Sequence, residues 1–280
     1  MTRRVVASGV VMAGPDSAAR LASNTRRRVE GMTESRKSTS FGQAAAAYES
    51  GRPEYPAAAV EWMLAPVREP GRALRVANVG AGTGKLTRAV VELGADVVAI
   101  DPDATMLASL QENVRGIPTF AGTAEDLPLP DSGLDALVMG QAWHWVDPDA
   151  GSREVGRVVR SGGVLGLVWN IRDERVEWVR RLTDAMGASH GERLIAAGGP
   201  RIAEPLIDLQ HRSWTWSRPI TLPQLRDLVF SRSDVITASP EERARIDAEV
   251  DGVVASVPGL ADGGAVDLPY VTHAYRARRP

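Results

Sequence analysis

Short apolar runs alternate with helically spaced apolar positions through the first half of the chain. Four runs have the length and composition of buried strands: 74–79, 96–100, 136–139 and 163–169. Segments with helical spacing precede or separate them: 56–67, 85–93, a stretch from about 104, and 152–160. Strands that alternate with helices in this way predict a parallel sheet that is covered by helices on both faces.

The pattern loosens after Asp173 but still predicts several elements. These are a helix near 175–187, a strand at 211–217, helices at 221–230 and 239–255, and a last strand near 267–277. We therefore predict an α/β fold with a Rossmann-like, seven-stranded, mostly parallel sheet, helices on both faces and a small helical lid inserted in the C-terminal half. The lid elements are expected around 175–210 and 221–256, within one domain that spans 39–280.

The first 38 residues show neither helical nor strand periodicity. They contain a run of three arginines and a Ser/Thr-rich stretch, so we expect a disordered lead over 1–38. A secretory signal around the apolar run 5–13, a translation start at Met32 and a functional basic arm are the alternatives. Residues 1–40 hold eight basic and three acidic side chains, whereas the whole chain has a formal net charge of −2. The remainder is therefore acidic, which argues against nucleic acid as the main partner.

Composition bears on several other kinds of site. No run approaches the roughly 18 consecutive apolar residues of a membrane span, and the chain has no cysteine. We therefore expect a cytoplasmic protein, a monomer or homodimer, with no membrane contact and no disulfides. The four histidines are scattered along the sequence without partners at metal-ligand spacing, so no metal site is expected.

A glycine-rich segment, Gly80-Ala81-Gly82-Thr83-Gly84, lies between a predicted buried strand and a predicted helix. Glycine allows a sharp turn and a close approach of a ligand to the backbone, and the following helix offers free N–H groups. Asp101 ends the next strand, 21 residues after Gly80, at the spacing where an acid binds ribose hydroxyls. A tight turn without a ligand, and an N-cap role for the acid, are the alternatives; Asp103 can serve as that cap instead.

Two other functions fit a Rossmann-like nucleotide site. An NAD-dependent oxidoreductase needs a GxGxxG turn, but Lys85 stands where that motif has Gly or Ala. A catalytically silent binding module is the second alternative, because a fold does not guarantee chemistry.

A series of short motifs follows in order along the chain: Phe41-Gly42, Tyr48, Arg52-Pro53, Tyr55-Pro56, Val79 to Thr87, Asp101-Pro102, Met106-Leu107, Ala124 to Pro128, His144-Trp145, Trp169-Asn170, Ser231 to Ser233 and Leu268 to Tyr270. In combination they resemble the class I methyltransferases of the type 11 group. The likeness is to bacterial enzymes similar to trans-aconitate and ubiquinone-biosynthesis methyltransferases, and it covers about 40–278.

This resemblance implies S-adenosylmethionine as cofactor. The glycine loop would cradle its methionine part, Asp101 would bind its ribose, and an arginine would suit its carboxylate. The residues implied to bind it are Tyr48, Arg52, Gly80, Ala81, Gly82, Thr83, Asp101, Pro102, Met106, Ala124, Glu125 and Gln141. One departure is Asn78, where the family usually has an acid, and we expect it to weaken cofactor binding.

Methyl transfer from a sulfonium is a direct in-line displacement, so the enzyme must mainly align the reactants and exclude water. We expect a small-molecule acceptor, in a pocket formed by Tyr55, Trp145, Trp169 and Asn170. His144 is the candidate general base, because histidine titrates near neutral pH and this one follows a strand. The alternative is that His144 holds a loop by hydrogen bonding.

Overall fold

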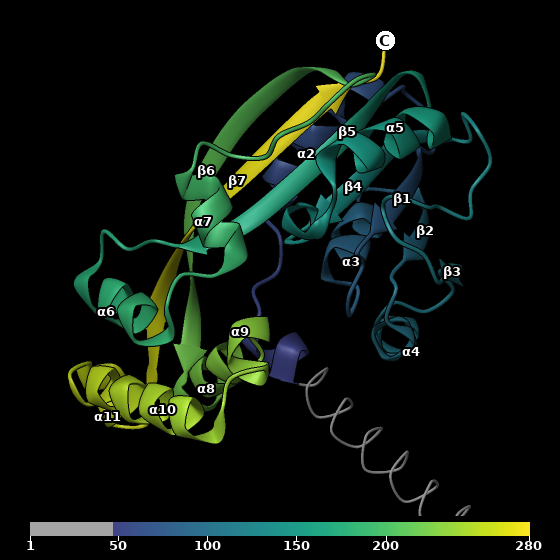
Figure 1. Ribbon diagram of the computed structural model, residues 1–280. Helices are drawn as coiled ribbons and strands as arrows, with labels where there is room; N and C mark the ends of the chain where they lie inside the picture. The colour runs from purple at the N-terminus through teal and green to yellow at the C-terminus, as the bar shows by residue number, and fades with distance from the viewer. Residues whose placement is uncertain (1–46) are drawn as a thin grey trace, which may run out of the picture. The chain divides into compact units, whose positions relative to one another are not determined.

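A single seven-stranded sheet organises the chain over residues 47–280, which are those that the computed structural model describes. The expectations for residues 1–38 lie outside that range. The strand order is β3-β2-β1-β4-β5-β7-β6 (Figure 1). The strands are β1 (Arg75–Val79), β2 (Asp96–Ile100), β3 (Thr119–Phe120), β4 (Leu134–Gly140), β5 (Val159–Arg172), β6 (Ile207–Thr221) and β7 (Ala265–Arg278).

The prediction of a mostly parallel sheet is confirmed. Strands β1 to β5 pair in parallel, and β7 is antiparallel to both of its neighbours, β5 and β6. The strand order reverses at β1, which has β2 on one side and β4 on the other. In open α/β sheets, ligands bind at such a switch point, outside the carboxyl ends of the strands.

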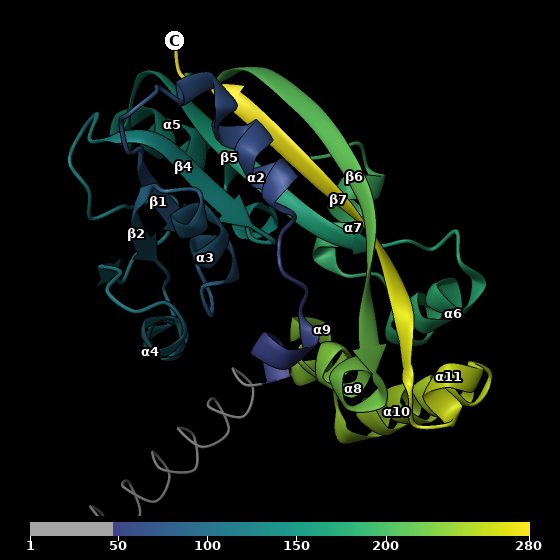
Figure 2. The same ribbon diagram turned by 180° about the vertical axis from the view of Figure 1, so that it is seen from behind.

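Helices cover both faces because successive strand residues point to opposite sides. Helices α2 (Ala57–Leu64) and α3 (Lys85–Glu92) pack on one face, in front of the sheet in Figure 2. Helices α5 (Pro148–Val158) and α7 (His190–Ala196) pack on the other face. Helix α4 (Ala104–Asn113) contributes Leu110, which packs with Ala81 and Ala99 next to the glycine loop.

A separate group of helices is built on the far ends of β6 and β7. These two strands continue to pair from Ser217–Pro269 to Thr221–Ala265, beyond the last β5 pair. The helices between and beside them are α6 (Glu177–Met186), α8 (Leu222–Phe230), α9 (Ser233–Ile236), α10 (Pro240–Ala255) and α11 (Pro258–Ala261). They share a hydrophobic core of their own with the ends of both strands, and we call them the helical layer (Figure 1).

The elements of the expected lid range 175–210 pack against two different cores. Only α6 of this range belongs to the helical layer, because α7 packs against the main core through Leu194 and Ile195. Residues 207–210 already belong to β6. The short elements that were not predicted are strand β3, helices α7, α9 and α11, and the 3-10 helix η2 (Trp143–Trp145). The predicted helix 56–67 ends in a 3-10 turn, η1 (Ala65–Val67). None of the helices in the described range is both long enough and apolar enough to span a membrane.

Candidate functional site

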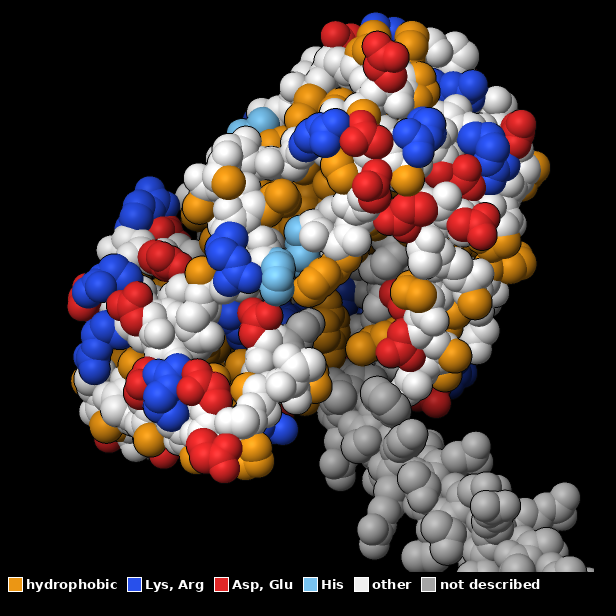
Figure 3. Space-filling model, in the orientation of Figure 1, with side chains coloured by type: hydrophobic (Ala, Val, Ile, Leu, Met, Phe, Trp, Pro, Cys, Tyr) orange, Lys and Arg blue, Asp and Glu red, His pale blue; other side chains and the backbone are white. Residues whose placement is uncertain are grey.

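A cleft of about 550 Å³, which we call the main cleft, opens at the carboxyl ends of β1, β2 and β4. Figure 3 shows a hollow with hydrophobic side chains at the centre of the visible face, beside histidine side chains. Ten of the residues expected to bind cofactor or acceptor line the main cleft: Tyr48, Gly80, Gly82, Asp101, Pro102, Met106, Ala124, Glu125, Gln141 and Trp145. The structure thus brings together residues that are almost 100 positions apart in the sequence.

The glycine loop needs glycine for two reasons. Gly80 has a φ of +63°, a left-handed conformation that other residues adopt at a cost. A Cβ atom at Gly80 would also lie 2.7 Å from Cβ of Ala142, the first residue after Gln141. The loop therefore passes too close to the β4 end for any side chain at this position, and its backbone faces the main cleft.

Asp101 holds this loop from the end of β2. Its carboxylate accepts one hydrogen bond from the Gly82 backbone N–H, at 2.8 Å, and one from that of Asp103, at 2.9 Å. Burial raises its pKa, although both hydrogen bonds oppose that shift. Asp103 itself caps α4 by accepting from Thr105 and Met106. The N-cap role thus belongs to Asp103, and Asp101 keeps free lone pairs beside the main cleft.

Two further polar residues of the main cleft, Gln141 and Glu125, are held by hydrogen bonds to the backbone. Gln141 has a φ of +54°, and its side-chain amide donates to the Asn170 carbonyl oxygen at 2.9 Å. Glu125 accepts a hydrogen bond from the Asp147 backbone N–H at 3.0 Å. The main cleft therefore carries polar groups that the protein holds in place without a ligand.

Residues 47–51 are helical and bring Tyr48 and Arg52 to the site. The Arg52 guanidinium lies 5.2 Å from the centre of the Tyr48 ring and donates to the Ser231 carbonyl oxygen at 3.4 Å. An ion pair and a hydrogen bond hold the chain around Tyr48 and Arg52 against the glycine loop and α3. Lys85 Nζ lies 2.7 Å from Glu54, and the Thr83 hydroxyl donates to Glu49 at 2.7 Å. The hydroxyl of Thr83, a residue expected to bind cofactor, is thus engaged with Glu49.

Arg52, Ala81 and Thr83, which do not line the main cleft, lie around a small inner cavity of about 20 Å³ beside it. Tyr55 and Asn170 line the same inner cavity. The Asn170 amide is already engaged, because it donates to the Glu54 carbonyl and accepts from the Thr272 hydroxyl. These residues brace the wall of the main cleft from behind.

The four residues expected to form the acceptor pocket do not line one cavity: Trp145 lines the main cleft, Tyr55 and Asn170 line the inner cavity, and Trp169 lines neither. Trp169 is completely buried in the core, where it packs edge-on against Tyr275. Its indole N–H donates to Nδ1 of His144 at 3.3 Å. Trp145 is the opposite case, because 59% of its surface is exposed and its ring lies 4.5 Å from that of His190. Trp145 can therefore contact a ligand directly, whereas Trp169 acts through His144.

Burial and the neighbouring His190 lower the pKa of His144 to about 4. The ring is therefore neutral near pH 7, and its Nδ1 accepts from Trp169. In a neutral imidazole the other nitrogen then carries the proton. The geometry accordingly makes His144 a hydrogen-bond donor and favours the loop-holding interpretation over the general base.

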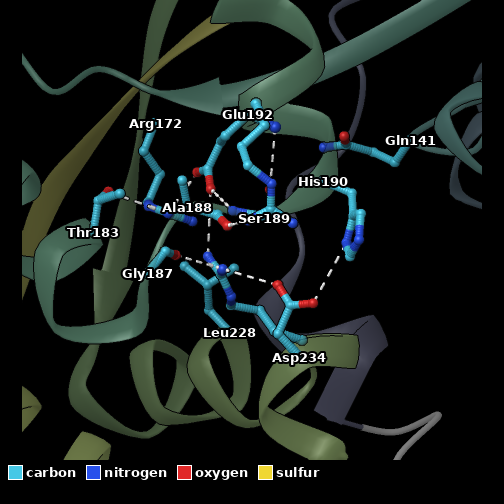
Figure 4. A network of polar contacts seen from close by, with 12 residues as sticks. Gln141, Arg172, Thr183, Gly187, Ala188, Ser189, His190, Glu192, Leu228 and Asp234 are labelled. Carbon is cyan, nitrogen blue, oxygen red and sulfur yellow. Dashed lines mark hydrogen bonds and ion pairs between the residues drawn. The ribbon is translucent and has the colours of Figure 1, made fainter.

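A further cavity, of about 90 Å³, adjoins the main cleft and was not predicted; we call it the side cavity. It shares Tyr48, Gln141 and Trp145 with the main cleft. The remaining lining residues are Arg52, His144, Ser189, His190, Gly191, Arg232 and Asp234. Figure 4 shows how α7 and the segment after α8 meet there, with His190 facing Asp234.

One signal in the sequence could have located part of this wall. Ser189 and Glu192 form a capping box at the start of α7, an S-x-x-E pattern that is readable in the sequence.

The histidines are also less scattered than expected. His144 and His190 stack with ring centres 6.2 Å apart, and His211 Nε2 lies 3.1 Å from His273 Nδ1. Within residues 47–280, no three His, Cys, Asp or Glu side chains gather as a metal site.

Comparisons with known proteins identify the family. The model of a methyltransferase domain matches residues 77–167, from β1 to β5. An uncharacterised methyltransferase of Mycobacterium tuberculosis is 44% identical over 253 residues, which cover 88% of this chain and 99% of the relative. The chain belongs to the methyltransferase family. It is an enzyme with S-adenosylmethionine as its cofactor, which decides against the NAD-dependent oxidoreductase.

More distant matches agree with this assignment. An uncharacterised methyltransferase of Schizosaccharomyces pombe is 28% identical over 236 residues, covering 83% of this chain and 94% of the relative. A solved structure assigned to a type II methyltransferase from Anaeromyxobacter dehalogenans superposes with a TM-score of 0.61 and 20% identity. It covers 81% of this chain and 97% of the other. At that identity the likeness concerns the fold alone.

The departure at Asn78 has a local explanation. Its side chain is fully buried, its amide N–H donates to the Val138 carbonyl oxygen at 3.1 Å, and its Oδ1 accepts from the Thr87 hydroxyl at 2.8 Å. Asn78 thus links β1 to β4 and to α3. A carboxylate would lack the N–H that the Val138 carbonyl requires.

Proposed function

We propose that the chain transfers a methyl group from S-adenosylmethionine in the main cleft to a small-molecule acceptor in the side cavity. The observation that carries this proposal is the wall that the two spaces share, which consists of Tyr48, Gln141 and Trp145. A group held in the side cavity would meet a group held in the main cleft at this wall. Such an arrangement suits a direct in-line displacement.

The residues of the main cleft fit the cofactor. Its volume lies within the roughly 300–1,000 Å³ of small-molecule sites. At Gly80 the loop leaves space that a Cβ would fill, and Asp101 retains lone pairs for ribose hydroxyls. Arg52, without a carboxylate within ion-pair distance in the described range, could bind the cofactor carboxylate, with Tyr48 beside it.

The cofactor, when bound, supplies a methyl carbon that is already activated by its positively charged sulfur. The chain then has to hold the acceptor in line with that carbon and keep water away. Trp145 and Tyr48 offer aromatic surface for the acceptor at the shared wall. His144, as a neutral donor, would orient an acceptor oxygen or nitrogen without removing a proton.

A small molecule is favoured over a macromolecule by the size and position of the side cavity. A space of about 90 Å³ between α7, η2 and the segment after α8 has room for only a small group of atoms. The acidic body also disfavours nucleic acid. A relation to trans-aconitate or ubiquinone-biosynthesis methyltransferases rests on the short motifs alone.

Transfer of label tests this proposal. The full chain is incubated with methyl-labelled S-adenosylmethionine and a bacterial extract, which is then separated into small-molecule, protein and nucleic-acid fractions. The proposal expects label in the small-molecule fraction, and roughly tenfold less of it with the Asp101→Ala variant when the cofactor concentration is kept below the wild-type Kd. Label that accumulates only in protein or nucleic acid would overturn the choice of acceptor class. Binding of cofactor without any transfer would favour the catalytically silent module.

A further inference from the structure

The wall of the side cavity contains a buried arginine whose charge is poorly neutralised. Arg232 is only 2% exposed, yet it lines this cavity. Among the described residues, its one hydrogen bond shorter than 3 Å goes to the Gly187 carbonyl oxygen, at 2.6 Å. Its contacts with carboxylates are long, 3.5 Å to Glu192 and 3.5 Å to Asp234. A buried charge normally requires closer pairing than this.

Glu192 cannot fully compensate Arg232, because it is used elsewhere. One of its oxygens lies 2.6 Å from Arg172, which is also buried, and the other accepts the Ser189 N–H at 2.7 Å (Figure 4). Asp234 is part-exposed and is shared with His190, which lies 3.5 Å away. Two carboxylates therefore match two buried arginines in number, but the close contact goes to Arg172 and the long ones to Arg232. Arg52 adds a further positive charge at the side cavity.

Two further observations point to missing negative charge. Within the part of the chain that the structure describes, the buried Nε atoms of Arg52, Arg172 and Arg232 have no hydrogen-bond partner. Burial, together with the neighbouring positive charge of Arg172, also lowers the pKa of Arg232 to about 10. Both are the expected signs of a guanidinium group in a site that lacks its counter-ion.

From this we infer that the acceptor carries an anionic group, such as a carboxylate, and that Arg232 binds this group in the side cavity. The inference rests on the proposed function and adds the chemical class of the acceptor. The anion would approach the Arg232 guanidinium from the side cavity, which Arg232 lines, and would supplement its two long carboxylate contacts. His144 and Ser189 supply further donors on the same wall.

Matched pairs of acids and amides test this inference. The full chain is saturated with S-adenosylhomocysteine and titrated calorimetrically with acetate against acetamide, butyrate against butyramide, and benzoate against benzamide. Each amide has nearly the same shape as its acid but no charge. We expect at least one acid to bind roughly tenfold or more tightly than its amide. Equal affinity within every pair, or no binding by any acid, would overturn the inference.

Variants then assign the preference to Arg232. Arg232→Gln should abolish the difference between acid and amide, and Arg232→Lys should keep part of it. Arg226→Gln is the control, because Arg226 lies on α8 outside the cavity and pairs with Asp247 and Asp251; it should leave the difference unchanged. An undiminished preference in Arg232→Gln would contradict the assignment. If Arg232→Gln does not fold, the wild-type pairs and Arg232→Lys decide.

The outcomes also separate this inference from the proposed function. Wild-type protein that binds S-adenosylhomocysteine but does not prefer acids overturns only the class of acceptor. Wild-type protein that fails to bind S-adenosylhomocysteine overturns the proposed function, and this inference with it.

Discussion

The indole N–H of Trp169 donates a hydrogen bond to Nδ1 of His144, with 3.3 Å between the two nitrogens. An indole nitrogen can only donate, so Nδ1 must be unprotonated and the neutral ring carries its proton on Nε2. Burial lowers the pKa of His144 to about 4, which keeps the ring neutral across the physiological range. A completely buried tryptophan thus determines which nitrogen of a cavity histidine can donate.

His144→Gln should therefore retain most of the enzyme's activity. Glutamine can still accept from Trp169 and donate into the side cavity, whereas loss of a general base typically costs 10²–10⁴-fold. We expect kcat/KM on an identified acceptor to fall by less than about tenfold. A loss of about a thousandfold, together with a wild-type pH profile that rises through pH 6–7, would show that His144 is a base after all.

The same histidine should make the fold sensitive to acid. Its ordinary pKa of 6.5 applies to the unfolded chain, so between pH 6.5 and about 4 the unfolded state binds a proton that the folded state does not. The free energy of unfolding should therefore fall as the pH drops through this window, and less so in His144→Gln. Urea denaturation at pH 7.5, 6 and 5 measures this, and equal slopes in both proteins would contradict the shift.

Much of the fold could be predicted from the sequence because the strands of the parallel core are continuous apolar runs. The helices at 85–93 and 239–255 were placed within about a residue of α3 and α10. The two-residue β3 and the turn at η2 are too short to leave a periodic pattern. The extent of the helical layer also escaped prediction, since no local pattern shows that α6 and α7 pack against different cores.

Gly80→Ala should impair cofactor binding as well as stability. The new Cβ would lie 2.7 Å from that of Ala142, so the loop must shift away from β4. Gly71→Ala is the matched control: it also has a positive φ, +76°, but nothing within 4 Å of the new Cβ. Both variants should lose about 1–2 kcal/mol of unfolding free energy from the left-handed backbone. Only Gly80→Ala should also weaken S-adenosylhomocysteine binding. Unchanged affinity in that variant would show that the close approach of the loop to Ala142 does not shape the cofactor site.

Asn78→Asp should destabilise the protein rather than restore a family feature. The carboxylate would face the Val138 carbonyl oxygen in a fully buried position, which should cost about 2 kcal/mol or more. Asn113→Asp is the control, because Asn113 also donates to a carbonyl oxygen, that of Thr83, but is exposed. Chemical denaturation compares the two. A stable Asn78→Asp variant with tighter cofactor binding would show that the missing charge matters more than the lost hydrogen bond.

The nucleotide side of the site was readable because its residues follow strands at fixed spacings. The glycine loop and Asp101 are examples: they belong to consecutive strand ends of one βαβ unit, and they meet in the structure. The side cavity was not readable, since it joins segments near 144, 190 and 232 that only the folded chain brings together. Arg232 is a further case, because its burial follows from the packing of the helical layer and not from any local pattern.

The most direct test of the central claim is calorimetric titration of the full chain with S-adenosylmethionine, S-adenosylhomocysteine and NAD, with Asp101→Ala as the variant and Asp103→Asn as its control. Asparagine can still cap α4, so the control should bind normally. We predict that both sulfur nucleotides bind, that NAD does not, and that Asp101→Ala loses binding by roughly tenfold or more. Failure of both sulfur nucleotides to bind, or binding of NAD alone, would contradict the account.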